Sequence, residues 1–137
     1  MTVEELRNIP YLANEIKRFD KLISDLDRNA ENDKKAIPIQ MKSEFDEAIE
    51  EYRNVLIDCR ERCRHELKTL TAFIEGIEDQ YIKSIFKARF VDQKSWCRVA
   101  YNMGGYNSED TVKMTCHRYL EKYNARAENR PQSENTL

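Results

Sequence analysis

Hydrophobic residues recur every three or four positions through most of the chain, which is the spacing of amphipathic helices. In the N-terminal part the steps alternate between three and four residues, and the positions are Ile9, Leu12, Ile16, Phe19, Ile23 and Leu26. This rhythm is typical of a helix that keeps one narrow seam against a partner helix. It predicts a first helix over residues 3–28.

A second seam follows after a short interruption. Its members are Met41, Phe45, Ile49, Tyr52, Leu56, Cys59, Cys63, Leu67, Leu70, Ile74 and Ile77. Residues 29–38 lack periodicity and end in Pro38, which predicts a linker. Helices of about 25 and 36 residues would span roughly 38 and 54 Å. An antiparallel arrangement buries both seams, and the longer helix overhangs. We expect the overhang, with the outward Tyr11 and Phe73, to be covered by a second copy or by the C-terminal residues.

Three shorter helices are predicted in the C-terminal part. The first carries Tyr81, Ile82, Ile85, Phe86 and Phe90 on one side. The second covers residues 95–103, and the third runs from Ser108 to about Tyr123 after the turn Gly104-Gly105-Tyr106-Asn107. Ser108 is a favourable N-cap, and Glu109 and Asp110 suit the positive start of a helix. Residues 124–137 are polar, contain Pro131 and show no apolar spacing, so they predict a disordered tail.

Composition supports a helical protein. A charged fraction of 35% with only three Gly and three Pro is typical of amphipathic helices. The expected fold class is all-α, with a long N-terminal antiparallel helical hairpin (coiled coil, 1–77), a C-terminal three-helix helix-turn-helix module (78–123) and a tail (124–137). No stretch approaches the roughly 18 apolar residues that a membrane span needs, and the start lacks the pattern of a signal peptide. We therefore expect a cytoplasmic protein without a membrane partner.

The sequence offers little for catalysis or metal binding. We expect the four cysteines, Cys59, Cys63, Cys97 and Cys116, to be reduced and without a disulfide in a cytoplasmic protein. Cys59 and Cys63 lie on the seam while His65 points elsewhere, whereas structural zinc usually takes paired Cys at short loop spacings with two further ligands. There is no Ser/His/Asp set and no glycine-rich phosphate loop. We therefore predict no enzyme, no cofactor and no metal.

Short helices joined by a glycine-containing turn are the ground plan of a helix-turn-helix. One helix of such a pair crosses the phosphate backbone, and the next places its N-terminal residues in the major groove. Residues 78–123 hold eight Lys and Arg against six Asp and Glu, although the whole chain has a formal net charge of −2. This local excess permits DNA binding without requiring it.

Several stretches of the chain resemble a known family. They run over residues 88–100, 104–112 and 118–120 (ARFVDQKSWCRVA, GGYNSEDTV and RYL), with the N-terminal LRNIPYL and Glu15-Ile16. These stretches resemble small phage-encoded transcriptional regulators of Firmicutes whose C-terminal part is similar to region four of sigma factors. The resemblance covers both ends of the chain but not the middle.

The resemblance implies which side of the last helix faces DNA. Val112, Tyr119 and Leu120 would pack inward, and the groove-facing set would be Glu109, Asp110, Lys113, Met114 and His117. Helical spacing agrees with this division. Met114 departs from the expected polar base reader, and the two acids can accept from cytosine but repel phosphate.

Phosphate contacts are expected from Lys94, Arg98, Arg118 and Lys122, where the helix-turn-helix plan predicts positive charge, and from the backbone N–H groups at the two helix starts. We expect Trp96 to be a core residue, because large aromatic side chains usually bury their surface. The predicted DNA-binding residues are Lys94, Ser95, Arg98, Ser108, Glu109, Asp110, Lys113, Met114, His117, Arg118 and Lys122.

These patterns favour a sequence-specific DNA-binding transcriptional regulator encoded by a phage or prophage, in the cytoplasm of the host. The expected partners are double-stranded DNA, a second copy bound through the hairpin, and RNA polymerase or another host protein. Two alternatives stay open: a coiled-coil protein that binds or inhibits a protein partner, and a phage DNA-packaging recognition subunit. A basic, accessible surface on the last helix favours DNA, whereas an apolar or acidic one favours a protein partner.

Overall fold

A computed structural model describes residues 1–105 and 107–129. All regular structure in these ranges is helical and none is strand, so the expected all-α class is confirmed. The helices are α1 (Val3–Leu6), α2 (Asn8–Lys35), α3 (Lys42–Glu75), α4 (Gln80–Phe86), α5 (Trp96–Met103) and α6 (Glu109–Glu128), with a 3₁₀ turn at Ile39–Met41 and a π-turn at Lys87–Val91. The chain divides into two compact units. We call Tyr11–Thr69 the arm, and Met1–Pro10 together with Leu70–Leu137 the end unit.

The first predicted helix is interrupted near its start. Thr2 caps α1 by accepting a hydrogen bond from the Glu5 amide at 3.1 Å, and α1 ends at Leu6. Pro10 lies in the first turn of α2, where its missing N–H needs no partner. In one continuous helix its ring would collide with the carbonyl of Leu6, because that carbonyl lies four residues earlier. The break at Arg7 therefore follows from Pro10.

Most of the predicted linker over residues 29–38 is helical, which corrects that prediction. α2 continues to Lys35, and only residues 36–38 separate it from the 3₁₀ turn. Asn29 to Lys35 contain no helix breaker, and Lys34 forms an ion pair with Asp46 at 2.8 Å. Lys34 and Lys35 also suit the negative end of a helix. The helix stops just before Pro38, which disfavours helical backbone at the residue preceding it.

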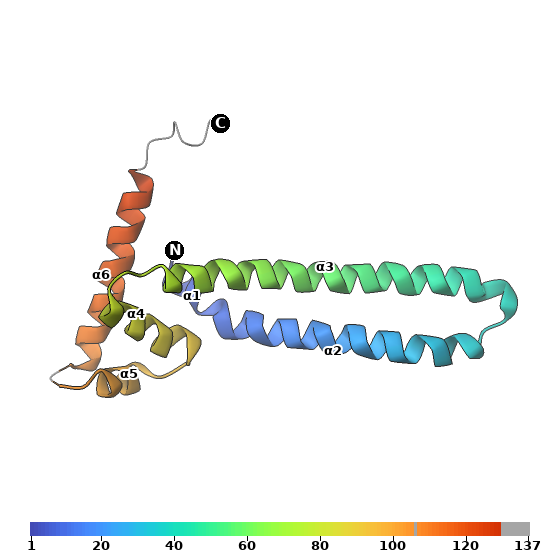
Figure 1. The fold of residues 1–137 in the computed structure, drawn as a ribbon, viewed down its shortest axis with the longest axis horizontal. Coiled ribbons are helices and arrows are strands. Elements are labelled where there is room, and N and C mark those ends of the chain that lie inside the picture. Colours follow the sequence, from blue (N-terminus) through green and yellow to red (C-terminus); the bar gives the residue numbers. More distant parts are fainter. Residues whose placement is uncertain (106, 130–137) are drawn as a thin grey trace. The chain divides into compact units, whose positions relative to one another are not determined.

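In the arm, α2 and α3 run side by side in opposite directions (Figure 1). Four ion pairs join them, and three of these follow a regular order: Lys34 with Asp46 at 2.8 Å, Arg53 with Asp27 at 2.9 Å, and Arg60 with Asp20 at 3.0 Å, while Arg64 also reaches Asp20 at 3.7 Å. Successive members of these three are seven residues apart on both helices. A constant step of seven residues is typical of two helices that pack against each other with a heptad repeat.

The arm buries little of its own surface. Leu12, Ile23 and Leu56 are its buried residues. Most other seam residues are half-buried, and Met41 and Tyr52 remain 53% and 50% exposed, contrary to the expectation that they pack inward. Two helices share one interface, so residues at its edges stay in contact with water.

The end unit has a larger core. One cluster consists of Ile85, Ala88, Val99, Ala100 and Val112, with Trp96 and Met103 against it. An adjoining aromatic group contains Phe73, Phe86, Phe90, Tyr119 and Tyr123. The Phe73 and Tyr123 rings lie 4.7 Å apart, edge to face. The sequence placed residues 70–77 in the hairpin, but they pack with α4 and α6. These two helices therefore cover Phe73, as expected for the C-terminal residues.

Helix α6 is longer than predicted and ends at Glu128, so residues 124–128 are not part of a disordered tail. Within this extension, Asn124 is bonded to the first residue of the chain. Its side-chain oxygen accepts a hydrogen bond from the nitrogen of Met1 at 2.9 Å, and its side-chain nitrogen donates to the carbonyl of Met1 at 2.9 Å. The rest of the predicted tail, residues 130–137, lies outside the described residues.

Candidate nucleic-acid interface

The turn between α5 and α6 is tied to α4. The Tyr81 hydroxyl donates to the Asn107 side-chain oxygen at 2.9 Å, and the Asn107 side-chain nitrogen donates to the Gly104 carbonyl at 3.0 Å. Gly104 has φ 70° and ψ 179°, a conformation that essentially only glycine adopts, and Gly105 has φ 65°. Tyr106, the third residue of the predicted turn, lies outside the described residues. This role of Tyr81 was not predicted from the sequence.

The start of α5 is fixed by side chains on both sides of it. Ser95 accepts a hydrogen bond from the Arg98 amide at 3.2 Å, so it caps the helix. Just before it, Arg89 donates to the carbonyl of Lys94 at 3.0 Å. The same guanidinium lies 4.8 Å from the Trp96 ring centre. Trp96 packs on the core cluster as expected but remains half-buried.

The start of α6 follows the predicted pattern. The Ser108 hydroxyl accepts from the Thr111 amide at 3.2 Å, which confirms the predicted N-cap. Val112 and Leu120 are buried as expected, and so is Cys116 between them, while Tyr119 is half-buried. The opposite side of α6 is therefore the side that solvent reaches.

The predicted interface residues are mostly accessible. Two are half-buried, Lys94 and Lys113. The exposed ones are Ser95, Arg98, Ser108, Glu109, Asp110, Met114, His117, Arg118 and Lys122. Helix α6 thus presents cations, acids and an apolar side chain together.

Ion pairs neutralise part of the local positive charge. The Lys113 ammonium lies 3.3 Å from the Glu109 carboxylate, so this predicted base reader is engaged within its own helix. Lys83 and Lys87 lie 3.1 and 2.8 Å from Glu75. Hydrogen bonds from Lys87 and then Lys83 hold the pKa of Glu75 below its usual value. Because Glu75 precedes residues 78–123, the local charge count overestimated the accessible positive charge.

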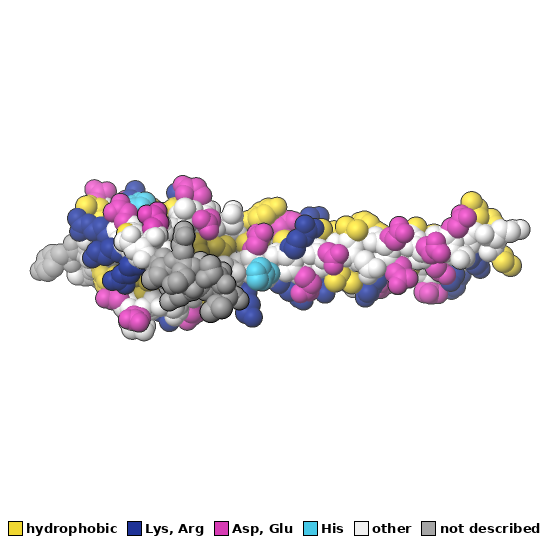
Figure 2. Space-filling view, turned by 90° about the horizontal axis from the view of Figure 1, so that it is seen from above, with side chains coloured by type: hydrophobic (Ala, Val, Ile, Leu, Met, Phe, Trp, Pro, Cys, Tyr) yellow, Lys and Arg dark blue, Asp and Glu magenta, His cyan; other side chains and the backbone are white. Residues whose placement is uncertain are grey.

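Three predicted phosphate contacts are exposed and unpaired. Arg98, Arg118 and Lys122 have no carboxylate partner among residues 1–105 and 107–129. Arg118 and Lys122 lie one turn apart on α6. In Figure 2, Lys and Arg side chains gather at the left end of the molecule, which carries α4–α6 in Figure 1.

Two further exposed side chains were missed, and one of them belongs to this surface. Tyr101 is 78% exposed and follows Arg98 by three residues on α5, so the two share a face. Arg126 is exposed and follows Lys122 by four residues, but it lines a hollow with Glu78, Asp79 and Tyr119 on the packed side of α6. The four-residue spacing of Arg118, Lys122 and Arg126 is visible in the sequence, but Arg126 falls in the predicted tail.

The cysteines and the acidic side chains offer no alternative site. All four cysteines are free: Cys59 and Cys63 are half-buried, Cys97 is exposed and Cys116 is buried. Burial raises the pKa of Cys116 to about 12, so its thiol stays protonated at neutral pH. Within the part of the chain that the structure describes, no three His, Cys, Asp or Glu residues are grouped to hold a metal ion.

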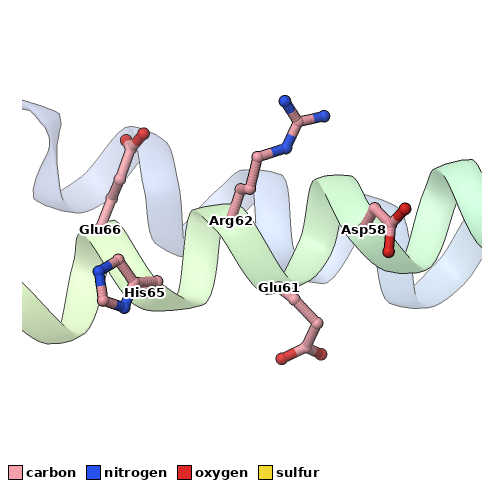
Figure 3. A pocket seen from close by; sticks show the side chains of 5 residues that line it. All are labelled: Asp58, Glu61, Arg62, His65 and Glu66. Atoms are coloured by element: carbon pink, nitrogen blue, oxygen red, sulfur yellow. The ribbon is translucent and has the colours of Figure 1, made fainter.

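An open hollow on α3 is a weaker candidate (Figure 3). Its lining residues are Asp58, Glu61, Arg62, His65 and Glu66, all from one helix. In Figure 3 the side chains of Arg62 and Glu66 point to one side, and those of Glu61 and His65 to the other. A charged surface of one helix does not enclose a ligand.

The surface of α5 and α6 is therefore the candidate interface. Comparisons with protein-family models, curated proteins and solved structures found no match to this chain. No helix in the described ranges has the length and apolar character needed to cross a membrane. The assignment of function rests on the residues and their geometry.

Proposed function

We propose that this protein is a DNA-binding transcriptional regulator in which α5 and α6 act as the helix-turn-helix. The observation that carries the proposal is the exposure of Arg98, Arg118 and Lys122, without carboxylate partners among the described residues, on two helices whose starts are capped by serine. Lys and Arg side chains and the backbone N–H groups of helix N-termini are groups that hold phosphate. The sequence resemblance to small phage-encoded regulators supports the same proposal and suggests phage or prophage genes as the target.

In this proposal α6 enters the major groove. Arg118 and Lys122 contact phosphates, while His117 and Met114 face base edges. Met114 is 50% exposed, and its apolar side chain suits the methyl group of thymine. The ion pair between Lys113 and Glu109 lowers the repulsion between the acidic helix start and the phosphates.

The phosphate contacts are tested with a matched pair of variants. Lys122→Ala is compared with Lys17→Ala, which removes the same charge from an exposed position on the arm. We expect Lys122→Ala to weaken binding to all duplexes alike and to reduce the slope of log K against log salt by about 0.9. Lys17→Ala should match the parent. Equal effects of the two variants would remove α6 from the interface.

The base contacts are tested on a duplex selected from a random pool. His117→Ala or Met114→Ala should cost about 1–3 kcal/mol on the selected duplex and leave non-specific binding nearly unchanged. Glu109→Gln removes an acid and frees Lys113, so it should strengthen binding to every duplex. A full-length protein that shifts no DNA at low salt, where electrostatic binding is strongest, would refute the proposal.

A second candidate function is binding to a protein such as RNA polymerase or another host protein. Exposed Tyr101 and Met114 favour it, because large exposed aromatic and Met side chains are enriched at protein interfaces. Recovery of genomic fragments and of proteins from one lysate separates the two. Enrichment of specific DNA fragments supports the regulator. Recovery of a protein whose binding depends on Tyr101, with no enrichment of DNA, supports the protein-binding function.

A further inference from the structure

The arm exposes more large apolar side chains than it buries. Tyr11, Met41, Tyr52 and Val55 are 61%, 53%, 50% and 56% exposed. A stable domain normally encloses its core between at least two packed layers, and the arm has one layer of two helices. An additional layer would cover these residues.

The exposed residues share one side of the arm. From Met41 in the 3₁₀ turn into α3, Met41, Phe45, Ala48, Tyr52, Val55 and Cys59 follow one another in steps of four and three residues, so that Ala48 and Val55 widen the apolar side of α3 beyond the seam that faces α2. A groove on this side is lined by Leu22, Asp25, Leu26, Asn29, Ala30, Asp33, Ile49 and Tyr52. The groove therefore combines apolar side chains of both helices with acids along α2.

Charge is distributed unevenly along the arm. The half that includes the tip, residues 22–56, carries nine Asp and Glu against five Lys and Arg. The remaining half, residues 11–21 and 57–69, carries seven Lys and Arg against five Asp and Glu. Figure 2 shows acidic side chains gathered over the tip half. A partner that runs along the whole arm is favoured if it brings positive charge to the tip half and negative charge to the other half.

We infer that the occupant is a second copy of this chain, packed antiparallel along the groove side of the arm. The arm itself has the complementary charge pattern when it is turned end to end. The two copies form a four-helix layer related by a two-fold axis near the middle of the arm, so that each tip half lies on the partner's basic half. A parallel arrangement places acidic halves together, which is unfavourable. This inference does not depend on DNA binding.

The interface is tested by adjacent substitutions in the full-length chain. Val55→Asp places a carboxylate on the groove side, whereas Asn54→Asp adds the same charge about 100° away around α3. Both parent residues are exposed, so neither change disturbs the arm of a single chain. In sedimentation equilibrium we expect a dimer for the parent and for Asn54→Asp, and dimerisation weakened by about a hundredfold or more for Val55→Asp. A monomeric parent at tens of micromolar, or a Val55→Asp variant as dimeric as the parent, would overturn the inference.

The orientation is tested by the distance between the two tips. A nitroxide is introduced at Gln40, in the exposed 3₁₀ turn, as a non-natural amino acid that leaves the cysteines in place. Pulsed electron spin resonance should give a separation of about 40 Å, close to the length of α2. A separation below about 20 Å, expected for neighbouring parallel helix pairs, would overturn the antiparallel arrangement.

The two proposals fail separately. A dimer that shifts no DNA at low salt contradicts the proposed function and leaves the antiparallel arm pair standing. A monomer that binds DNA contradicts the arm pair and leaves the proposed function standing.

Discussion

Replacement of Gly104 by Ala tests the turn that sets α6 against α5. The backbone at Gly104 has φ 70° and ψ 179°, where a residue with a Cβ is strained by on the order of 1–3 kcal/mol. A Cβ built at Gly104 meets no atom within 4 Å, so the loss comes from the backbone and not from a clash. Alanine also reduces the conformational entropy of the unfolded chain, which raises the free energy of unfolding by about 0.4–1 kcal/mol and offsets part of the strain. The expected net loss in the free energy of unfolding is about 1–2 kcal/mol.

Equilibrium urea unfolding followed by far-ultraviolet circular dichroism measures this loss. Gly105→Asn is the control, because Asn tolerates positive φ better than other residues and Gly105 has φ 65°. We expect the control to lose less than Gly104→Ala. If Gly104→Ala unfolds at the same urea concentration as the parent, the reasoning about this turn is wrong.

Three further predictions concern stability. Leu56→Asp buries an unpaired carboxylate in the arm and should lower the free energy of unfolding by about 3 kcal/mol or more; a thermal melt like that of the parent would contradict the helix pairing. Tyr81→Phe removes the hydrogen bond to Asn107 and should cost about 0.5–1.5 kcal/mol in urea unfolding, and an unchanged midpoint would show that this bond contributes nothing. Burial raises the pKa of Cys116 to about 12 from its ordinary value of 9.0, so the unfolded state ionises first as pH rises, and stability should fall between these values by at most about 4 kcal/mol. Urea titrations at several pH values in this range should show that the free energy of unfolding falls less steeply with pH for Cys116→Ala than for the parent. Equal slopes would show that burial does not raise the pKa of Cys116.

Features set by neighbouring residues could be predicted from sequence. Ser108 caps α6 by bonding an amide three residues ahead, and Val112, Cys116 and Leu120 repeat at helical spacing on its buried side. Both are local properties of the chain. The accessible face of α6 was predictable for the same reason.

Helix ends and charge partners depended on distant residues and were harder to predict. In the segment of α2 that was predicted to be a linker, Lys34 pairs with Asp46 of α3, and in the segment of α6 that was predicted to be a tail, Asn124 bonds Met1. The partner of Lys83 and Lys87 is Glu75, which lies before the predicted module. Sequence spacing did make one pair visible: Glu109 and Lys113 are one turn apart, a spacing that favours an ion pair over a free base reader.

The seven-residue step between the ion pairs of the arm has a consequence for how this protein can change in length. Removing residues 28–34 from α2 and residues 46–52 from α3, one heptad from each helix that includes the pair of Lys34 with Asp46, would keep Asp27 opposite Arg53 and join equivalent positions on both helices. Removing residues from one helix alone would leave charged and apolar side chains opposite the wrong partners. The length of the arm can therefore change only in units of one heptad, or about 10.5 Å. Homologous or engineered versions should differ by whole heptads removed from both helices together.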